Sequence, residues 1–209
     1  TLAANSSGTV SSYSPAATTV TVFKGSTQLT IDASSPYADD TFRVAGARGS
    51  SISAGGNVTL GTAALIAVNG TVTAVEALTV STTANVDIDD NLTGDSVDIN
   101  GDGGISLAGD VRGTNQDVIF RDALTVDGNS TATSENGDLT FVSTIVGPFA
   151  LNAFADSGTV NFEDSVGAIA LASLVVTANA ANIAGNISAT AGVSFAGTEQ
   201  VNLDAADVV

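Results

Sequence analysis

The sequence lacks several residue types that carry much of protein chemistry, since it contains no cysteine, histidine, methionine or tryptophan. Without cysteine there are no disulfide bonds and no thiolate nucleophile. Without histidine there is no imidazole to act as a general base near neutral pH. No apolar run approaches the roughly 20 residues of a membrane-spanning helix, so we expect no membrane span.

Positive charge is also scarce, with 5 Lys and Arg against 22 Asp and Glu and a net charge of −17. Within residues 1–50 the few cations balance the few carboxylates. Beyond residue 50 only Arg112 and Arg121 oppose the remaining acidic side chains, so this part carries the whole net charge. Such a surface repels nucleic acid and anionic membranes and attracts cations.

What the sequence does contain is a short phrase that returns at intervals of about 21 residues. It reads QDVIF at 116–120, GDLTF at 137–141 and GTVNF at 158–162. Fainter copies lie at 56–60, 94–99 and 192–195. A repeat of roughly 20 residues with one short strand in each unit is typical of a solenoid.

Triplets of the form apolar–any–apolar start at positions that recur about every 20 residues, in three series. The first series is Val58, Leu78, Val97, Val118, Leu139 and Val160; the second is Ile66, Val86, Ile105, Leu124 and Ile145; the third, which is weaker, is Val72, Leu92 and Val111. Each triplet sends two side chains inward, because alternate residues of a strand point to opposite sides. The pattern predicts an all-β fold, a parallel β-helix solenoid of roughly 7–8 coils with Phe120, Phe141 and Phe162 stacked inside it.

An antiparallel sandwich is the alternative fold for short β-rich runs. The near-identity of the phrase at a step of about 21 residues favours the solenoid. After Val160 the spacing loosens, and AIALASLVV at 168–176 predicts a bulged or widened coil.

The segment before residue 50 does not share the repeat. Residues 1–17 are small and polar and predict an N-terminal arm, whereas residues 50–209 form the predicted β-helix. Residues 18–48 predict a small β cap or docking strands, because two β-rich runs flank a glycine turn at 24–27 and suggest a hairpin. The candidate self-association residues in these runs are Val20, Val22, Phe23, Leu29 and Ile31.

The densest group of acidic residues lies between Val86 and Val111. Within it, DINGDG at 98–103 has the alternating oxygen donors of a calcium loop, although it lacks the bidentate glutamate at the loop end. The candidate Ca²⁺ ligands are Asp87, Asp89, Asp90, Asp98, Asn100 and Asp102. The alternative is a solvated corner of the β-helix.

Catalysis is weakly supported by the residue types present. β-Helices include polysaccharide-active enzymes, but here both tyrosines, Tyr13 and Tyr37, lie outside the repeat. The adjacent carboxylates Glu163 and Asp164 fail as a glycosidase pair, because neighbouring strand residues point to opposite faces. We therefore expect that the protein is not an enzyme and has no cofactor other than a possible Ca²⁺.

Two stretches, TVNFEDSVG at 159–167 followed by LASLVVTA at 171–178, and AGNISATAGVSF at 184–195, resemble repeats of filamentous-haemagglutinin-like large exoproteins. The resemblance covers residues from about 50 to 209 and rests on low-complexity repeats. It implies a right-handed β-helix, a surface-exposed or secreted location, and a role in adhesins or fibres.

Three functions follow as expectations. The first is a structural subunit of an extracellular filament or cell-surface layer, a homopolymer that grows head to tail by strand addition or coil stacking. The second is an adhesin stalk, for which cell-surface glycans would be partners. The third is a polysaccharide-active enzyme, which the missing residue types disfavour.

Overall fold

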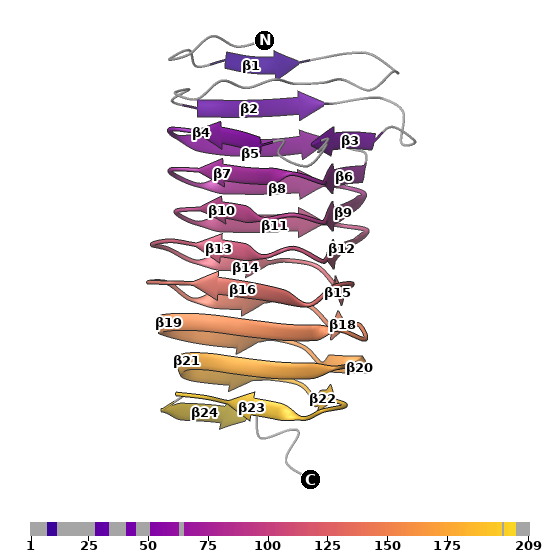
Figure 1. The fold of residues 1–209 in the computed structure, drawn as a ribbon, viewed down its shortest axis with the longest axis vertical. Coiled ribbons are helices and arrows are strands. Elements are labelled where there is room, and N and C mark those ends of the chain that lie inside the picture. The colour runs from indigo at the N-terminus through magenta and orange to yellow at the C-terminus, as the bar shows by residue number, and fades with distance from the viewer. Residues whose placement is uncertain are drawn as a thin grey trace.

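The computed structural model describes residues 8–11, 28–33, 41–44, 51–62, 65–197 and 199–203. In these segments the chain winds as a stack of coils, and each strand pairs in parallel with the strand above or below it (Figure 1). The described part contains no helix. The stack makes about seven turns, so the predicted parallel β-solenoid is confirmed. None of the described segments forms a helix with the length and hydropathy that a membrane crossing needs.

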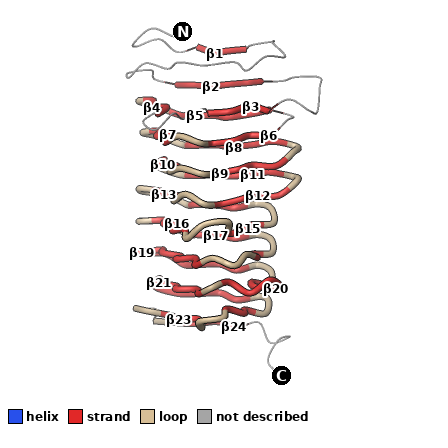
Figure 2. Tube along the Cα trace, turned by 45° about the vertical axis from the view of Figure 1, so that its right-hand side comes forward, coloured by secondary structure: helices blue, strands red, loops and turns tan. Residues whose placement is uncertain are grey.

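Each coil contributes strands to three faces. Figure 2 shows the coils stacked along the rod, with loops joining the strands of each coil. The first face contains the phrase that ends in Phe. Its strands are β1 (Gly8–Ser11), β2 (Gln28–Ala33), β5 (Asn57–Thr62), β8 (Leu78–Thr82), β11 (Val97–Gly101), β14 (Val118–Phe120), β17 (Leu139–Phe141), the end of β19 (Ala150–Phe162), the end of β21 (Ser173–Ile183), and β24 (Gln200–Leu203).

The second face is a separate 8-stranded sheet. Its strands are β3 (Thr41–Val44), β6 (Leu65–Val68), β9 (Asn85–Ile88), β12 (Gly104–Leu107), β15 (Leu124–Val126), β18 (Ile145–Val146), β20 (Val166–Leu171) and β22 (Ile187–Ala189). The third face contains β4 (Ser51–Ala54), β7 (Thr71–Ala74), β10 (Leu92–Gly94), β13 (Val111–Gly113), β16 (Ser130–Ser134), the starts of β19 and β21, and β23 (Val193–Phe195). Because β19 and β21 run from the third face into the first, these two faces form one 16-stranded sheet.

The register confirms the predicted triplet series. On the first face Val58 pairs with Leu78, and the ladder continues through Val97 to Val118 and beyond. On the second face Ile66 pairs with Val86. The third series, although weaker in sequence, also pairs in register, as Val72 with Leu92. Like positions therefore stack over like positions on all three faces.

The N-terminal segments differ from the prediction. Strand β2 pairs in parallel with β1 on one edge and with β5 on the other. The prediction that residues 28–31 form an antiparallel hairpin with the run before the turn at 24–27 is therefore wrong. Strand β3 likewise pairs with β6, and β1 lies within the segment expected to be an arm. The ladders thus reach back before residue 50. The spacing hid this, because Leu29 pairs with Val58 across an interval longer than the usual repeat.

The predicted widened coil is also present. The pairing of β20 with β22 shifts register between Val166 and Leu171. Gly167 adopts φ of +86° at the shift, a conformation that favours glycine. Ile169 within the irregular strand is 62% exposed. The extra residues therefore bulge outward and leave the ladder on either side intact.

The interior of the rod is a continuous apolar core, and the predicted phenylalanine ladder lies within it. Phe120 and Phe141 stack with ring centroids 5.1 Å apart and an interplanar angle of 12°. Phe141 and Phe162 stack at 5.4 Å and 4°. All three side chains are buried. The stacking distance is close to the strand spacing of about 4.8 Å, so the coil rise positions the rings.

We predict that Phe141→Ala lowers the free energy of unfolding by about 3–5 kcal/mol, because it opens a cavity between two stacked rings. Denaturant unfolding followed by circular dichroism measures this. The neighbouring Val142→Ala is the control, since Val142 is 37% exposed and points away from the core. Equal losses in the two variants would contradict the internal ladder.

Candidate functional site

The predicted calcium loop lies at the end of β11 and in the turn after it. Asp98 binds Arg121 of the next coil through two hydrogen bonds, of 2.7 Å from Nε and 2.6 Å from Nη2. The hydrogen bond that Arg121 donates to Asp98, followed by the negative charge of Asp98, raises the pKa of the Arg121 guanidinium above its ordinary value. Asp102 accepts a hydrogen bond of 3.2 Å from Asn100 Nδ2. The carboxylate oxygens of Asp98 and Asp102 that would bind Ca²⁺ therefore already accept hydrogen bonds from other side chains.

The other three candidate ligands lie elsewhere on the rod. Asp87 belongs to β9 on the second face, and Asp89 and Asp90 follow β9 at the next corner. Asp89 accepts a hydrogen bond from Asn69 of the previous coil. Asp90 Oδ1 accepts 3.1 Å from Thr71 Oγ1. No group of three or more His, Cys, Asp or Glu in the described residues is arranged to hold a metal ion. The calcium site stays a prediction.

A structural use of other Asn and Asp side chains was missed in the sequence. At the start of the first face, an Asn or Asp accepts the backbone N–H of the equivalent residue one coil later. Asn57 Oδ1 accepts from Ala77 N at 3.0 Å, and Asp138 Oδ1 accepts from Thr159 N at 2.8 Å. Asp117 Oδ1 accepts from Asp138 N at 2.8 Å. We call these contacts the Asx staples, since each joins two coils through a side chain and not through the backbone pairing of the strands.

The same arrangement recurs where the third face begins. Asn91 Oδ1 accepts from Asp110 N at 3.2 Å, and Asp110 Oδ1 accepts from Thr131 N at 2.8 Å. Asn129 Oδ1 accepts from Ala150 N at 3.1 Å. These Asn and Asp side chains therefore satisfy backbone N–H groups where one face of the coil meets the next. The signal was the regular position of Asx just before a triplet.

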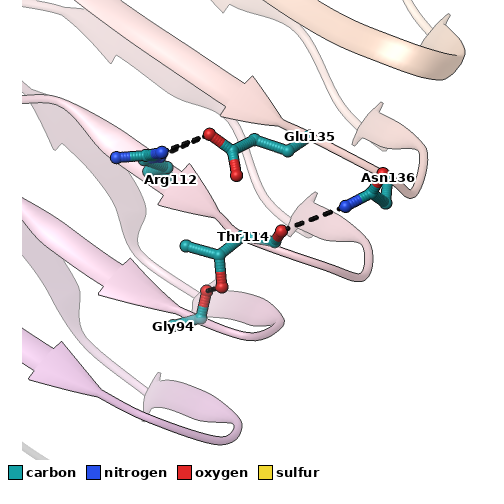
Figure 3. Close-up of polar contacts among 5 residues, drawn as sticks. All are labelled: Gly94, Arg112, Thr114, Glu135 and Asn136. Carbon is teal, nitrogen blue, oxygen red and sulfur yellow. Dashed lines mark hydrogen bonds and ion pairs between the residues drawn. The ribbon is translucent and has the colours of Figure 1, made fainter.

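Further polar contacts join coils at the corner between the third and first faces (Figure 3). Thr114 Oγ1 donates to Gly94 O at 3.3 Å, and Asn136 Nδ2 donates to Thr114 O at 3.3 Å. Arg112 Nε donates to Glu135 Oε1 at 3.0 Å. The side chains of this ion pair are 54% and 31% exposed, so its contribution is small. These contacts run along the rod and bind coil to coil.

The candidate self-association residues divide into two groups. Leu29 and Ile31 lie in β2, whose two edges are both paired within the chain. Val20, Val22 and Phe23 lie outside the described residues. Strand β2 therefore has no free edge for a second molecule. Within the described part, free edges occur at the two ends of the rod.

The C-terminal end is formed by β22, β23 and β24, which we call the last coil. Strands β23 and β24 pair with β21 alone, and β22 pairs with β20 alone. Val201 is 41% exposed and Leu203 is 60% exposed. The equivalent inward positions of the coils before it are buried, as at Val160 and Phe162. The last coil thus presents apolar residues that have no following coil among the described residues.

A row of amides runs along the outside of the first face to this end. Asn202 Nδ2 donates to Asn182 Oδ1 at 2.7 Å, and Asn182 Nδ2 donates to Asn161 Oδ1 at 2.8 Å. Asn161 Nδ2 donates to Thr140 Oγ1 at 3.3 Å. We call this row the asparagine ladder. The sequence signal was the return of Asn before Phe162, Ile183 and Leu203.

A hollow of about 300 Å³ lies beside the asparagine ladder at the C-terminal end. Its lining comes from three successive coils: Asn161, Phe162, Glu163, Asn182, Ile183, Ala184, Asn202 and Leu203. Most of these residues occupy repeated positions of the first face and its following corner. The hollow is therefore a feature of the end of the stack and contains no constellation of catalytic groups.

Comparisons with known proteins found no match: no family model, no curated protein and no solved structure is similar to this chain. The candidate site is thus defined by the geometry of the rod, and its two elements are the last coil and the asparagine ladder.

We predict that Asp138→Ala lowers the free energy of unfolding by about 1 kcal/mol, because Thr159 N–H loses its acceptor. Hydrogen exchange should show faster exchange of the Thr159 amide. Asp138→Asn keeps Oδ1 and should behave like the native protein, as Asn57 fills the same position. Asp127→Ala, at an exposed corner, is the control. Unchanged exchange at Thr159 in Asp138→Ala would contradict the Asx staple.

The calcium loop has its own test. A cation at Asp98 must replace Arg121, so Arg121→Ala should bind Ca²⁺ about threefold more tightly than the native protein if the loop is a site. Asp102→Asn should weaken binding. Isothermal titration with CaCl₂ measures both. Absence of binding heat in the native protein and in Arg121→Ala would rule out the calcium loop.

Proposed function

We propose that this β-solenoid is a structural rod of an extracellular filament or cell-surface layer, in which copies stack head to tail through their end coils. The observation that carries the proposal is the exposure of Val201 and Leu203. At the same ladder positions Val58, Leu60 and Leu78 are fully buried. Residues of a type that the rest of the stack buries are thus exposed in the last described coil, and a further coil would cover them.

The two ends suit a contact between unlike surfaces. The first face ends with β1 at one end of the rod and with β24 at the other (Figure 1). All strands of this face run in the same direction, so a second copy in the same orientation continues the sheet. A contact of this kind does not close on itself and builds an open fibre.

Charge supports the same arrangement. Residues 1–50 are neutral, whereas the rest of the chain carries the net charge of −17. Side-by-side packing of two rods would bring two acidic bodies together, whereas stacking end to end brings the acidic body against the neutral segment. The outward polar residues of the rod bond mainly to neighbouring coils, which suits a scaffold better than a broad binding surface.

We predict that Leu203→Glu weakens self-association at least about tenfold, because it places a charge where stacking would bury an apolar side chain. Sedimentation velocity over a concentration series, with electron microscopy of the concentrated protein, measures this. Val75→Glu is the matched control: Val75 is 65% exposed on the side of the rod, against 60% for Leu203. Its assembly should equal that of the native protein.

Native protein that remains monomeric at high concentration, with and without Ca²⁺, would contradict the proposed function. A monomer that binds cell-surface glycans on an array would favour the adhesin stalk. Turnover of an acidic polysaccharide would favour the enzyme.

A further inference from the structure

The strand register identifies which residues would meet at such a junction. One row of paired positions runs along the first face from β1 to β24. It contains Thr9, Thr30, Thr59, Thr79, Asp98, Ile119, Thr140, Asn161, Asn182 and Asn202. Threonine occupies the row at the N-terminal end, and the asparagine ladder occupies it at the C-terminal end. A stacked copy would continue this row past Asn202.

The hydrogen bonds of the asparagine ladder have one direction. Asn182 and Asn202 donate their Nδ2 toward the N-terminal end, and Asn161 and Asn182 accept at Oδ1 from the C-terminal side. At the end of the row, Asn202 Oδ1 accepts 2.7 Å from Gln200 Nε2 of the same strand. An amide oxygen has two lone pairs, so Asn202 can accept one further hydrogen bond. The group that continues the row must therefore be a donor, and a hydroxyl meets this requirement.

The inward positions on either side of the row impose a second condition. Val201 and Leu203 are the partly exposed ends of two apolar ladders. An incoming strand must place a residue without a polar side chain over each of them and a donor between them. Strand β1 has this order, with Gly8, Thr9 and Val10 in register with Leu29, Thr30 and Ile31 of the face that it begins.

From these observations we propose that β1 of a second copy pairs in parallel with β24, in the register Gly8 to Val201, Thr9 to Asn202 and Val10 to Leu203. The inference rests on the proposed head-to-tail stacking and specifies its interface. This register pairs the end of the asparagine ladder with a hydroxyl residue, Thr9, and pairs Leu203 with an apolar residue, Val10. The asparagine ladder then sets the register, since a slip by one residue puts Gly8 or Val10, neither of which has a side-chain donor, opposite the amide.

The absence of cysteine makes the register directly measurable. In a double variant Thr9→Cys and Asn202→Cys, the two thiols of one molecule lie about 40 Å apart, at opposite ends of the row. They cannot form a disulfide within the chain. Directly paired residues of two stacked copies are within disulfide range. Mild oxidation should give a ladder of species at multiples of 20.5 kDa on a non-reducing gel.

The matched control is Thr9→Cys with Asn182→Cys. Asn182 is exposed in the same row but one coil further from the end. It should give no ladder above the level of the Thr9→Cys single variant. Circular dichroism verifies that each variant folds. Hydrogen exchange of the native protein gives an independent reading: amides of β1 and β24 should gain protection on assembly, and those of β14 should not change.

The outcomes separate the two proposals. If the native protein assembles but the Thr9→Cys, Asn202→Cys pair gives no more cross-linking than the control, or β1 gains no protection, this register is wrong and end-to-end stacking stands. If the native protein does not assemble, both proposals fail. Cross-linking specific to the Thr9 and Asn202 pair, together with protection of β1 and β24, establishes the interface.

Discussion

Stacking of parallel strands one coil apart is the constraint on which the rest of this structure depends. A single coil cannot bury its inward side chains, because nothing covers it along the axis. Each coil therefore relies on identical spacing in its neighbours. The Phe120–Phe141–Phe162 stack is the clearest result, since its ring separations of 5.1 and 5.4 Å follow from the rise between coils. The packing of such a core therefore depends on the alignment of like residues between coils more than on which apolar residues are present.

The corners carry the second requirement, which is to satisfy backbone groups where the strands bend. The Asx staples meet it by binding an N–H of the next coil, and glycine allows neighbouring backbones to approach. At Gly158 an added Cβ would lie 2.1 Å from the carbonyl oxygen of Gly137 in the previous coil. Corner positions are therefore restricted by contacts between coils, even though they lie on the surface. The Asn and Asp residues of the staples and the glycine at Gly158 thus have a structural role at the corners.

The sides and the C-terminal end of the rod differ in how their side chains are used. Along its sides, carboxylates and amides that could have bound cations or sugars bond to the adjacent coil, as Asp98 does with Arg121. At the C-terminal end the same ladders stop with Val201 and Leu203 partly exposed. A scaffold that extends by adding further copies uses the interaction that already holds each copy together. The same coil-to-coil stacking, within and between copies, is the physical basis of the proposed function.

The sequence alone determined the fold class, the three ladders and the buried phenylalanines, because a period near the length of one coil leaves few alternatives for apolar–any–apolar triplets. It also located the bulged coil after Val166, where the period breaks. It did not place β2 and β3, since pairing between Leu29 and Val58 spans an irregular interval that no periodic pattern reveals. Nor did it reveal the Asx staples. Which Asn and Asp side chains face a backbone N–H one coil away depends on the stacking of distant residues, and only the tertiary structure decides it.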